Sequence, residues 1–232
     1  MEDKEKVPTI AQSGTTRRAF LKGAVAATGG AVAIASVASA APRAAKAEEA
    51  SPMSRYLFAE RQNCTGCRAC EYACSTYHEG TVRPAASRVH VLRHKGIVDV
   101  PVICWHCDDA PCIEACPVTP KAIKKDKETN GIILDEKACL GSRCLQCVDA
   151  CPAQYLRTHP DTCMPLFCDL CGGDPQCVKA CLAQSGNPQG PCLLGSKVGF
   201  GVNQAYRDVT PEEAGEDLIK RFYYPNNDGG RR

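Results

Sequence analysis

Eighteen cysteines in 232 residues constrain this chain more than any other feature. They stand against only five phenylalanines and one tryptophan, so apolar packing alone is a poor basis for the fold. Sixteen of them form four groups, each ending in Cys-x3-Cys. The groups are Cys64-x2-Cys67-x2-Cys70-x3-Cys74, Cys104-x2-Cys107-x4-Cys112-x3-Cys116, Cys139-x4-Cys144-x2-Cys147-x3-Cys151 and Cys168-x2-Cys171-x5-Cys177-x3-Cys181.

This spacing predicts iron–sulfur ligation. Three cysteines on one tight loop can wrap three corners of a cubane, while the fourth, one helical turn onward, points away and ligates the neighbouring cluster. Groups of this kind therefore work in pairs. Four complete groups predict sixteen ligands for four [4Fe–4S] clusters.

Zinc and disulfides are the two alternatives to clusters. Zinc sites usually separate two Cys-x2-Cys hooks by a longer loop, and adjacent hooks are poor disulfide geometry. No Cys-x-x-Cys-His occurs, so attached c-type haem is not indicated. Zinc or disulfides would leave a scaffold that only holds partners.

Group three and the two leftover cysteines leave choices open. Cys139-x4-Cys144-x2-Cys147 also matches the plant-type [2Fe–2S] spacing, although Cys151-Pro152 would then lack a cluster. Cys163 could replace Cys168, but Cys168-Asp-Leu-Cys171 is the tighter hook. Cys163 and Cys192 receive no role beyond a buried thiol or a disulfide.

Three other side chains lie inside the groups. We expect His106 to donate a hydrogen bond beside a cluster rather than to ligate it. Arg68 and Arg143 either raise a cluster's potential or are ordinary solvated charges.

The amino terminus predicts export. Thr16-Arg17-Arg18-Ala19-Phe20-Leu21-Lys22 precedes a weakly apolar run, Ala24 to Ala40, that ends in a small-x-small pattern. The paired arginines resemble the twin-arginine signal, which exports folded proteins; an ordinary secretory signal or a poor membrane helix is the alternative. We therefore expect a signal peptide over 1–40, a flexible lead-in over 41–54 and a periplasmic protein, soluble or held on the membrane by a partner. No later stretch approaches the roughly 20 apolar residues of a transmembrane helix.

Charge and local patterns complete the picture. The formal net charge of +2 resides in the first 40 residues, which argues against a nucleic-acid partner. Short apolar runs predict a hairpin over 122–134 with an Asn-Gly turn signal, and another over 89–103 around Lys95-Gly96. Thr210-Pro211-Glu212-Glu213 predicts a capped helix over about 211–224.

The chain resembles the four-cluster ferredoxin-like subunits of molybdopterin oxidoreductases, such as those of dimethyl sulfoxide reductase and formate dehydrogenase. The resemblance covers about 55–195 and is most specific from Cys104 to Pro117. It implies an α+β fold of two ferredoxin-like dicluster modules, one nested within the other: an inner module at about 100–155 and an outer one at 55–99 plus 156–195. A C-terminal extension, 196–232, follows.

The resemblance also implies which cysteines share a cluster. Each set joins three cysteines of one group to the last cysteine of its paired group. The implied sets are Cys64, Cys67, Cys70 with Cys181; Cys168, Cys171, Cys177 with Cys74; Cys104, Cys107, Cys112 with Cys151; and Cys139, Cys144, Cys147 with Cys116.

The implied function is a non-catalytic electron relay. Its partners would be a molybdopterin or tungstopterin catalytic subunit and a quinone-reactive membrane subunit or cytochrome. The segment from Cys168 to Cys177 also looks like iron–sulfur companions of tungsten aldehyde oxidoreductases, and a hydrogenase companion is a further alternative. A substrate-binding cluster with an open iron is disfavoured by sixteen complete thiolates.

Overall fold

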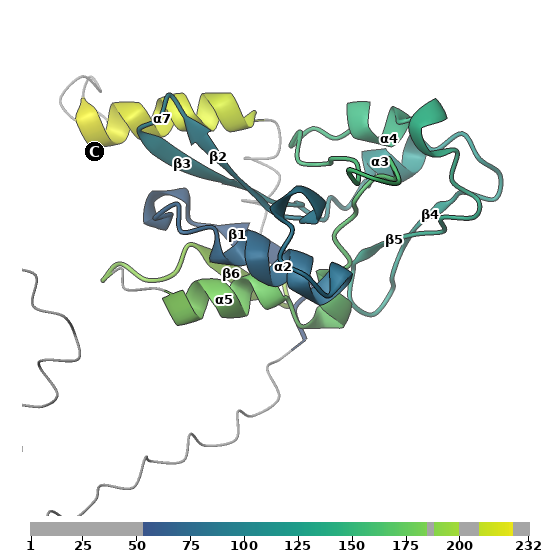
Figure 1. Ribbon diagram of the computed structural model, residues 1–232, viewed down its shortest axis with the longest axis horizontal. Helices are drawn as coiled ribbons and strands as arrows, with labels where there is room; N and C mark the ends of the chain where they lie inside the picture. Colours follow the sequence, from purple (N-terminus) through teal and green to yellow (C-terminus); the bar gives the residue numbers. More distant parts are fainter. Residues whose placement is uncertain (1–52, 185–187, 200–208, 225–232) are drawn as a thin grey trace, which may run out of the picture. The chain divides into compact units, whose positions relative to one another are not determined.

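The computed structural model describes residues 53–184, 188–199 and 209–224. The predicted signal peptide and nearly all of the lead-in lie outside these residues, as do parts of the predicted C-terminal extension. Short strands, short helices and loops make up the fold, as a ferredoxin-like iron–sulfur protein requires (Figure 1). In the described residues, no helix combines the length and apolar character needed to cross a bilayer.

The described residues contain three two-stranded antiparallel sheets. β1 (Tyr56–Ala59) pairs with β6 (Leu193–Ser196), which lies far away in sequence. The other two are the predicted hairpins, and both are confirmed: β2 (His90–His94) with β3 (Val98–Val102), and β4 (Ile123–Lys125) with β5 (Ile132–Leu134). Three residues, Lys95 to Ile97, join β2 and β3; Lys95 and Gly96 both have positive φ, and the Ile97 N–H donates to the His94 carbonyl, which closes a tight turn.

The two longest cysteine-bearing helices pack on each other. α2 (Ala69–Glu79) carries the end of group one and α5 (Gln176–Gln184) the end of group four, and Figure 1 shows them side by side near β1 and β6. Their shared core contains Leu57, Val89, Leu170 and Leu193 together with buried cysteines.

The corresponding helices of groups two and three are only one turn long. α3 (Pro111–Glu114) and α4 (Gln146–Asp149) contact each other, and α3 also contacts β4. Short 3-10 turns also connect elements within the described part of the chain, at Arg61–Asn63, Pro84–Ala86, Gly141–Arg143 and Leu170–Gly173. The core here consists of Trp105, Tyr155, Phe167 and aliphatic side chains around the cysteine loops.

α7 (Pro211–Tyr223) begins with the capping box that the sequence predicts. The Thr210 side chain accepts from the Glu213 N–H, and the Glu213 carboxylate accepts from the Thr210 N–H. Leu218 and Ile219 are buried against the β2–β3 hairpin, so the helix packs on its own chain. Phe222, near the end of the helix, is half exposed.

Candidate metal centres

The structure gathers the sixteen grouped cysteines into four sets, which we call sites A to D. Each site combines three cysteines of one group with the last cysteine of another. Site A is Cys64, Cys67, Cys70 and Cys181; site B is Cys74, Cys168, Cys171 and Cys177; site C is Cys104, Cys107, Cys112 and Cys151; site D is Cys116, Cys139, Cys144 and Cys147. Sites A, C and D each line one cavity. At site B the thiols lie close enough to raise one another's pKa through electrostatic repulsion of their thiolate forms.

One backbone feature recurs in all four groups. The residue two positions after the first cysteine has positive φ: Gly66, His106, Gly141 and Leu170. In each case its N–H donates to the first cysteine of the group. A left-handed residue at this point turns the chain so that its amide faces the sulfur, and such N–H···S bonds favour a thiolate.

A second left-handed residue starts the helix in three groups. Arg68, Ala110 and Leu145 precede α2, α3 and α4, two residues before the third cysteine. The turn aims the third cysteine back toward its own loop. The fourth cysteine, one helical turn later, reaches a different site.

Burial makes these thiols costly to ionise. It raises the pKa of Cys70 and Cys112 to about 12 and that of Cys147 and Cys171 to about 11. A cationic partner must therefore stabilise the thiolates, and its binding would release protons.

The spacing of the sulfurs tests which metal group the sites fit. A tetrahedral zinc ion, with Zn–S bonds of about 2.3 Å, holds its sulfurs about 3.8 Å apart. In the described residues, which include every cysteine, just one trio of potential ligands lies within 4.8 Å of one another, and it is His78, Asp169 and Cys171. No site holds three sulfurs that close. The cysteine sets fit a group larger than a single ion.

Two nitrogens of the Arg88 guanidinium at site B also fit an anionic cluster. Arg88 has two buried guanidinium nitrogens, Nε and Nη1, without a hydrogen-bond partner, and its charge opposes the effect of burial on the pKa of Cys74 and Cys171. Its backbone N–H donates to the Cys74 sulfur at 3.2 Å. A buried N–H donor without a partner is costly, so a negative group beside these two nitrogens would remove the cost.

The four sites form a series. At each step the negative charge of a thiolate at one site raises the pKa of a thiol at the next. Cys70 of site A raises that of Cys177 of site B, and Cys104 of site C raises that of Cys168 of site B. Cys147 of site D raises that of Cys112 of site C. Tyr155 lies between sites B and C, where its hydroxyl accepts from the Cys168 N–H at 2.8 Å. Charges at neighbouring sites are therefore close enough to affect each other, in the order A, B, C, D.

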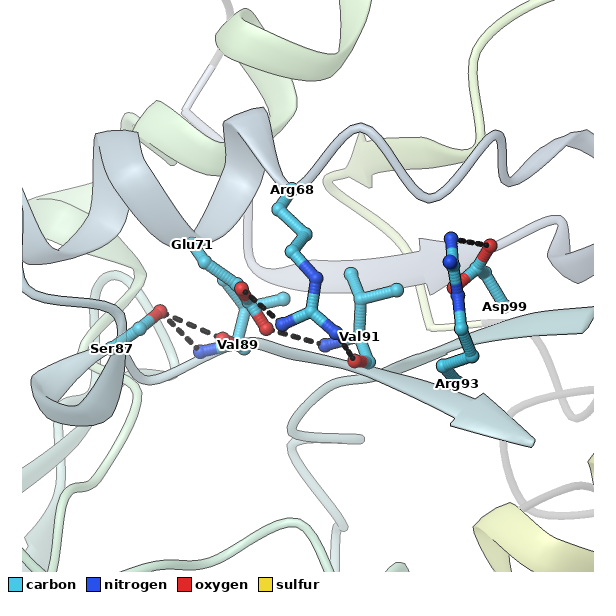
Figure 2. A network of polar contacts seen from close by, with 7 residues as sticks. All are labelled: Arg68, Glu71, Ser87, Val89, Val91, Arg93 and Asp99. Carbon is cyan, nitrogen blue, oxygen red and sulfur yellow. Dashed lines mark hydrogen bonds and ion pairs between the residues drawn. The ribbon is translucent and has the colours of Figure 1, made fainter. Parts of the chain in front are cut away.

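The arginines in the loops are not directed at the sulfurs. Figure 2 shows Arg68 bonded to the buried Glu71 carboxylate at 3.2 Å and to the Val91 carbonyl at 3.1 Å, while the Val91 N–H donates to Glu71 at 2.7 Å. This network docks the group-one loop on β2. Arg143 is exposed. At site C it is the His106 backbone N–H that contacts Cys104, and the imidazole Nδ1 lies 3.2 Å from the Asn130 carbonyl.

Sequence reasoning missed three residues at the sites. Arg88 and His78 carry no motif signal, and His78 Nε2 lies 3.8 Å from the Cys171 sulfur. Cys192 has no group spacing, yet it lines the cavity of site A and its thiol bonds to that of Cys64. That bond lowers the pKa of Cys64, against the effect of burial. Cys163 is exposed and lines none of the cysteine cavities.

Comparison with known proteins identifies the kind of chain. Residues 97–188 match the family described as a 4Fe-4S dicluster domain. The polyferredoxin-like subunit of an aliphatic sulfonate oxidoreductase from Pyrococcus furiosus is 41% identical over 54% of this chain and 70% of its own length. Electron transport protein HydN of Escherichia coli is 31% identical over 56% of this chain and 84% of its own. One of the subunits of tetrathionate reductase from Salmonella typhimurium is 28% identical over 72% of this chain and 71% of its own. The chain belongs to the family of polyferredoxin-like electron-transport proteins that bind [4Fe–4S] clusters.

Proposed function

We propose that this chain is a non-catalytic electron-transfer subunit that carries four [4Fe–4S] clusters, one at each of sites A to D, in two nested dicluster modules. It links a molybdopterin or tungstopterin catalytic subunit to a quinone-reactive membrane subunit or a cytochrome. The observation that carries the proposal is the arrangement of sixteen cysteines in four sets of four, with sulfurs too widely spaced for single zinc ions.

When bound, each cluster accepts and releases one electron. The protein holds it with four thiolates and directs backbone N–H groups at the ligand sulfurs. Burial keeps water away, and at site B the Arg88 charge offsets the negative charge. The sites lie in series, so electrons can enter at one end and leave at the other. Cys67 of site A is the one exposed cysteine among the sixteen, which makes site A a suitable end for exchange with a partner.

The partners are proposed from the relatives. Two of these are subunits of named enzymes, an aliphatic sulfonate oxidoreductase and a tetrathionate reductase. A second candidate function is the iron–sulfur companion of a tungsten aldehyde oxidoreductase-like enzyme. It is favoured because the segment from Cys168 to Cys177 resembles such companions. Isolation of the native complex distinguishes the two candidate functions, since only the relay to a membrane subunit or cytochrome requires such a partner.

Export is part of the proposal. The paired arginines Arg17 and Arg18 support a twin-arginine signal and a periplasmic location. Cell fractionation of the native chain and of an Arg17→Lys/Arg18→Lys variant tests it. We expect the native protein in the periplasm and the variant in the cytoplasm; equal export of both would remove the twin-arginine route.

Iron and acid-labile sulfide, measured on anaerobically purified protein, test the clusters. About sixteen of each per chain are expected from the ligand count, with EPR signals of coupled cubanes after reduction. A Cys147→Ser variant at site D should lose or alter one cluster, whereas Cys163→Ser should retain all four. Zinc in place of iron would exclude the relay.

A further inference from the structure

Site A differs from the other cysteine cavities in having a fifth sulfur. Cys192 belongs to none of the four groups, but its side chain lines the same cavity as Cys64, Cys67, Cys70 and Cys181. It is only 5% exposed, and its thiol is hydrogen-bonded to that of Cys64. The cavities of sites C and D are each lined by four cysteines.

Strand pairing fixes the position of this fifth sulfur. The Cys192 carbonyl accepts from the Glu60 N–H at 2.8 Å, directly beside the Ala59–Leu193 pair of the β1–β6 sheet. The next amide, Leu193 N–H, donates to the Cys181 sulfur at 3.3 Å. The segment that carries Cys192 therefore contacts two different cysteines of site A, one through its thiol and one through its backbone.

We propose that Cys192 is a positioning residue of site A: its thiol donates a hydrogen bond to the Cys64 thiolate ligand and raises the reduction potential of the cluster bound there. The inference rests on the proposed function, because it requires a cluster at site A. Four cysteines already complete a cubane, and Cys64 belongs to the tight loop with Cys67 and Cys70, so the fifth sulfur is left as the donor. An ordinary thiol is protonated at neutral pH and has an S–H to give.

The direction of the effect follows from charge. Reduction adds an electron to the cluster and makes its thiolate ligands stronger acceptors. A donor held against Cys64 therefore stabilises the reduced form more than the oxidised form. Low exposure strengthens the bond, because no water competes for the sulfur.

The test compares three variants of the full chain. Cys192→Ala removes the donor with little change in volume, Cys192→Ser replaces S–H by O–H, and Cys163→Ala removes the other cysteine outside the groups. Iron per chain and EPR-monitored redox titration are measured for each, and Cys67→Ser identifies the signal of site A. The reduction potential of the site A cluster is the deciding measurement, because a purely structural role of Cys192 would leave it unchanged.

We expect all three variants to keep the iron content of the native chain. In Cys192→Ala the one-electron reduction constant of the site A cluster should fall by about threefold to tenfold, as for loss of one weak hydrogen bond; tenfold corresponds to about 59 mV. Cys192→Ser should retain most of the native potential, and Cys163→Ala all of it.

Two results would overturn the inference while leaving the proposed function intact. An unchanged site A potential in Cys192→Ala at full iron content would show that no such bond acts on the cluster. Loss of about four irons per chain in that variant would make Cys192 a ligand. If the native chain binds no clusters, the proposed function fails first and the inference fails with it.

Discussion

The helices α2 and α5 and the helices α3 and α4 carry cysteines of the same pattern on unequal scaffolds. We call β1, α2, α5 and β6 the α2–α5 region and α3, β4, β5 and α4 the α3–α4 region. In the first, helices of 11 and 9 residues pack together over an aliphatic core. In the second, each helix has 4 residues.

The cysteine loops are nevertheless alike. In every group the residue two positions after the first cysteine is left-handed, and its amide donates to the sulfur of that cysteine. Loop geometry, and not helix length, therefore arranges the ligands. A helix of one turn cannot persist alone, so we expect the α3–α4 region to depend more on bound clusters for its folding.

The largest difference in stability between the two regions should appear when iron is removed. After anaerobic chelation, we expect amides of 104–156 to exchange at nearly the rate of an unfolded chain, while α2 and α5 keep partial protection because they pack on each other. Hydrogen exchange with mass spectrometry measures both in one sample, and the iron-loaded protein is the control. Equal loss of protection in both regions would show that the scaffolds do not differ in this respect.

Gly131→Ala tests the join between the regions. A Cβ on Gly131 would collide with the backbone of Asp169, beside Cys168, where β5 also donates from Ile132 N–H to the Cys168 carbonyl at 2.9 Å. We expect a loss of about 3 kcal/mol in the free energy of unfolding, because backbone must move.

Gly80→Ala is the matched control for this substitution. Gly80 has φ +69 but no neighbouring atom within 4 Å of a Cβ, so only backbone strain of about 1 kcal/mol is expected. Urea unfolding of the iron-loaded variants gives both values. A Gly80 cost equal to that of Gly131 would mean that close approach is not what holds the regions together.

Glu71→Ala weakens the α2–α5 region through the network in Figure 2. Glu71 is 3% exposed and accepts from both Arg68 and the Val91 N–H, so its loss leaves a buried amide without a partner. We expect a destabilisation of about 2 kcal/mol, measured by urea unfolding. Glu216→Ala, at an exposed ion pair on α7, should cost less; the reverse order would contradict the network's role.

Much of the local structure was predictable because its signals are local. The hairpin around Lys95-Gly96 and the capping box at Thr210 depend on residues within one turn, and both are present. The pairing of β1 with β6 was not predictable, since it joins segments more than 130 residues apart by short sequences that carry no motif. Cys192 was missed for the same reason: only that pairing brings it to Cys64.

The smallest effect that we expect is a loss of stability in acid, caused by a histidine beside the core of the α2–α5 region. Burial of His90 on β2, next to core residues Val89 and Val91, lowers its pKa to about 3. The unfolded chain binds a proton near pH 6.5 that the folded chain refuses, so stability is full above 6.5 and falls as pH drops from there toward 3. His90→Gln should remove about 1 kcal/mol of the loss between pH 7 and 5.5. Urea unfolding at both pH values measures it, and a slope unchanged in the variant would place the acid sensitivity elsewhere, with the thiolate ligands of the α3–α4 region as the next site to examine.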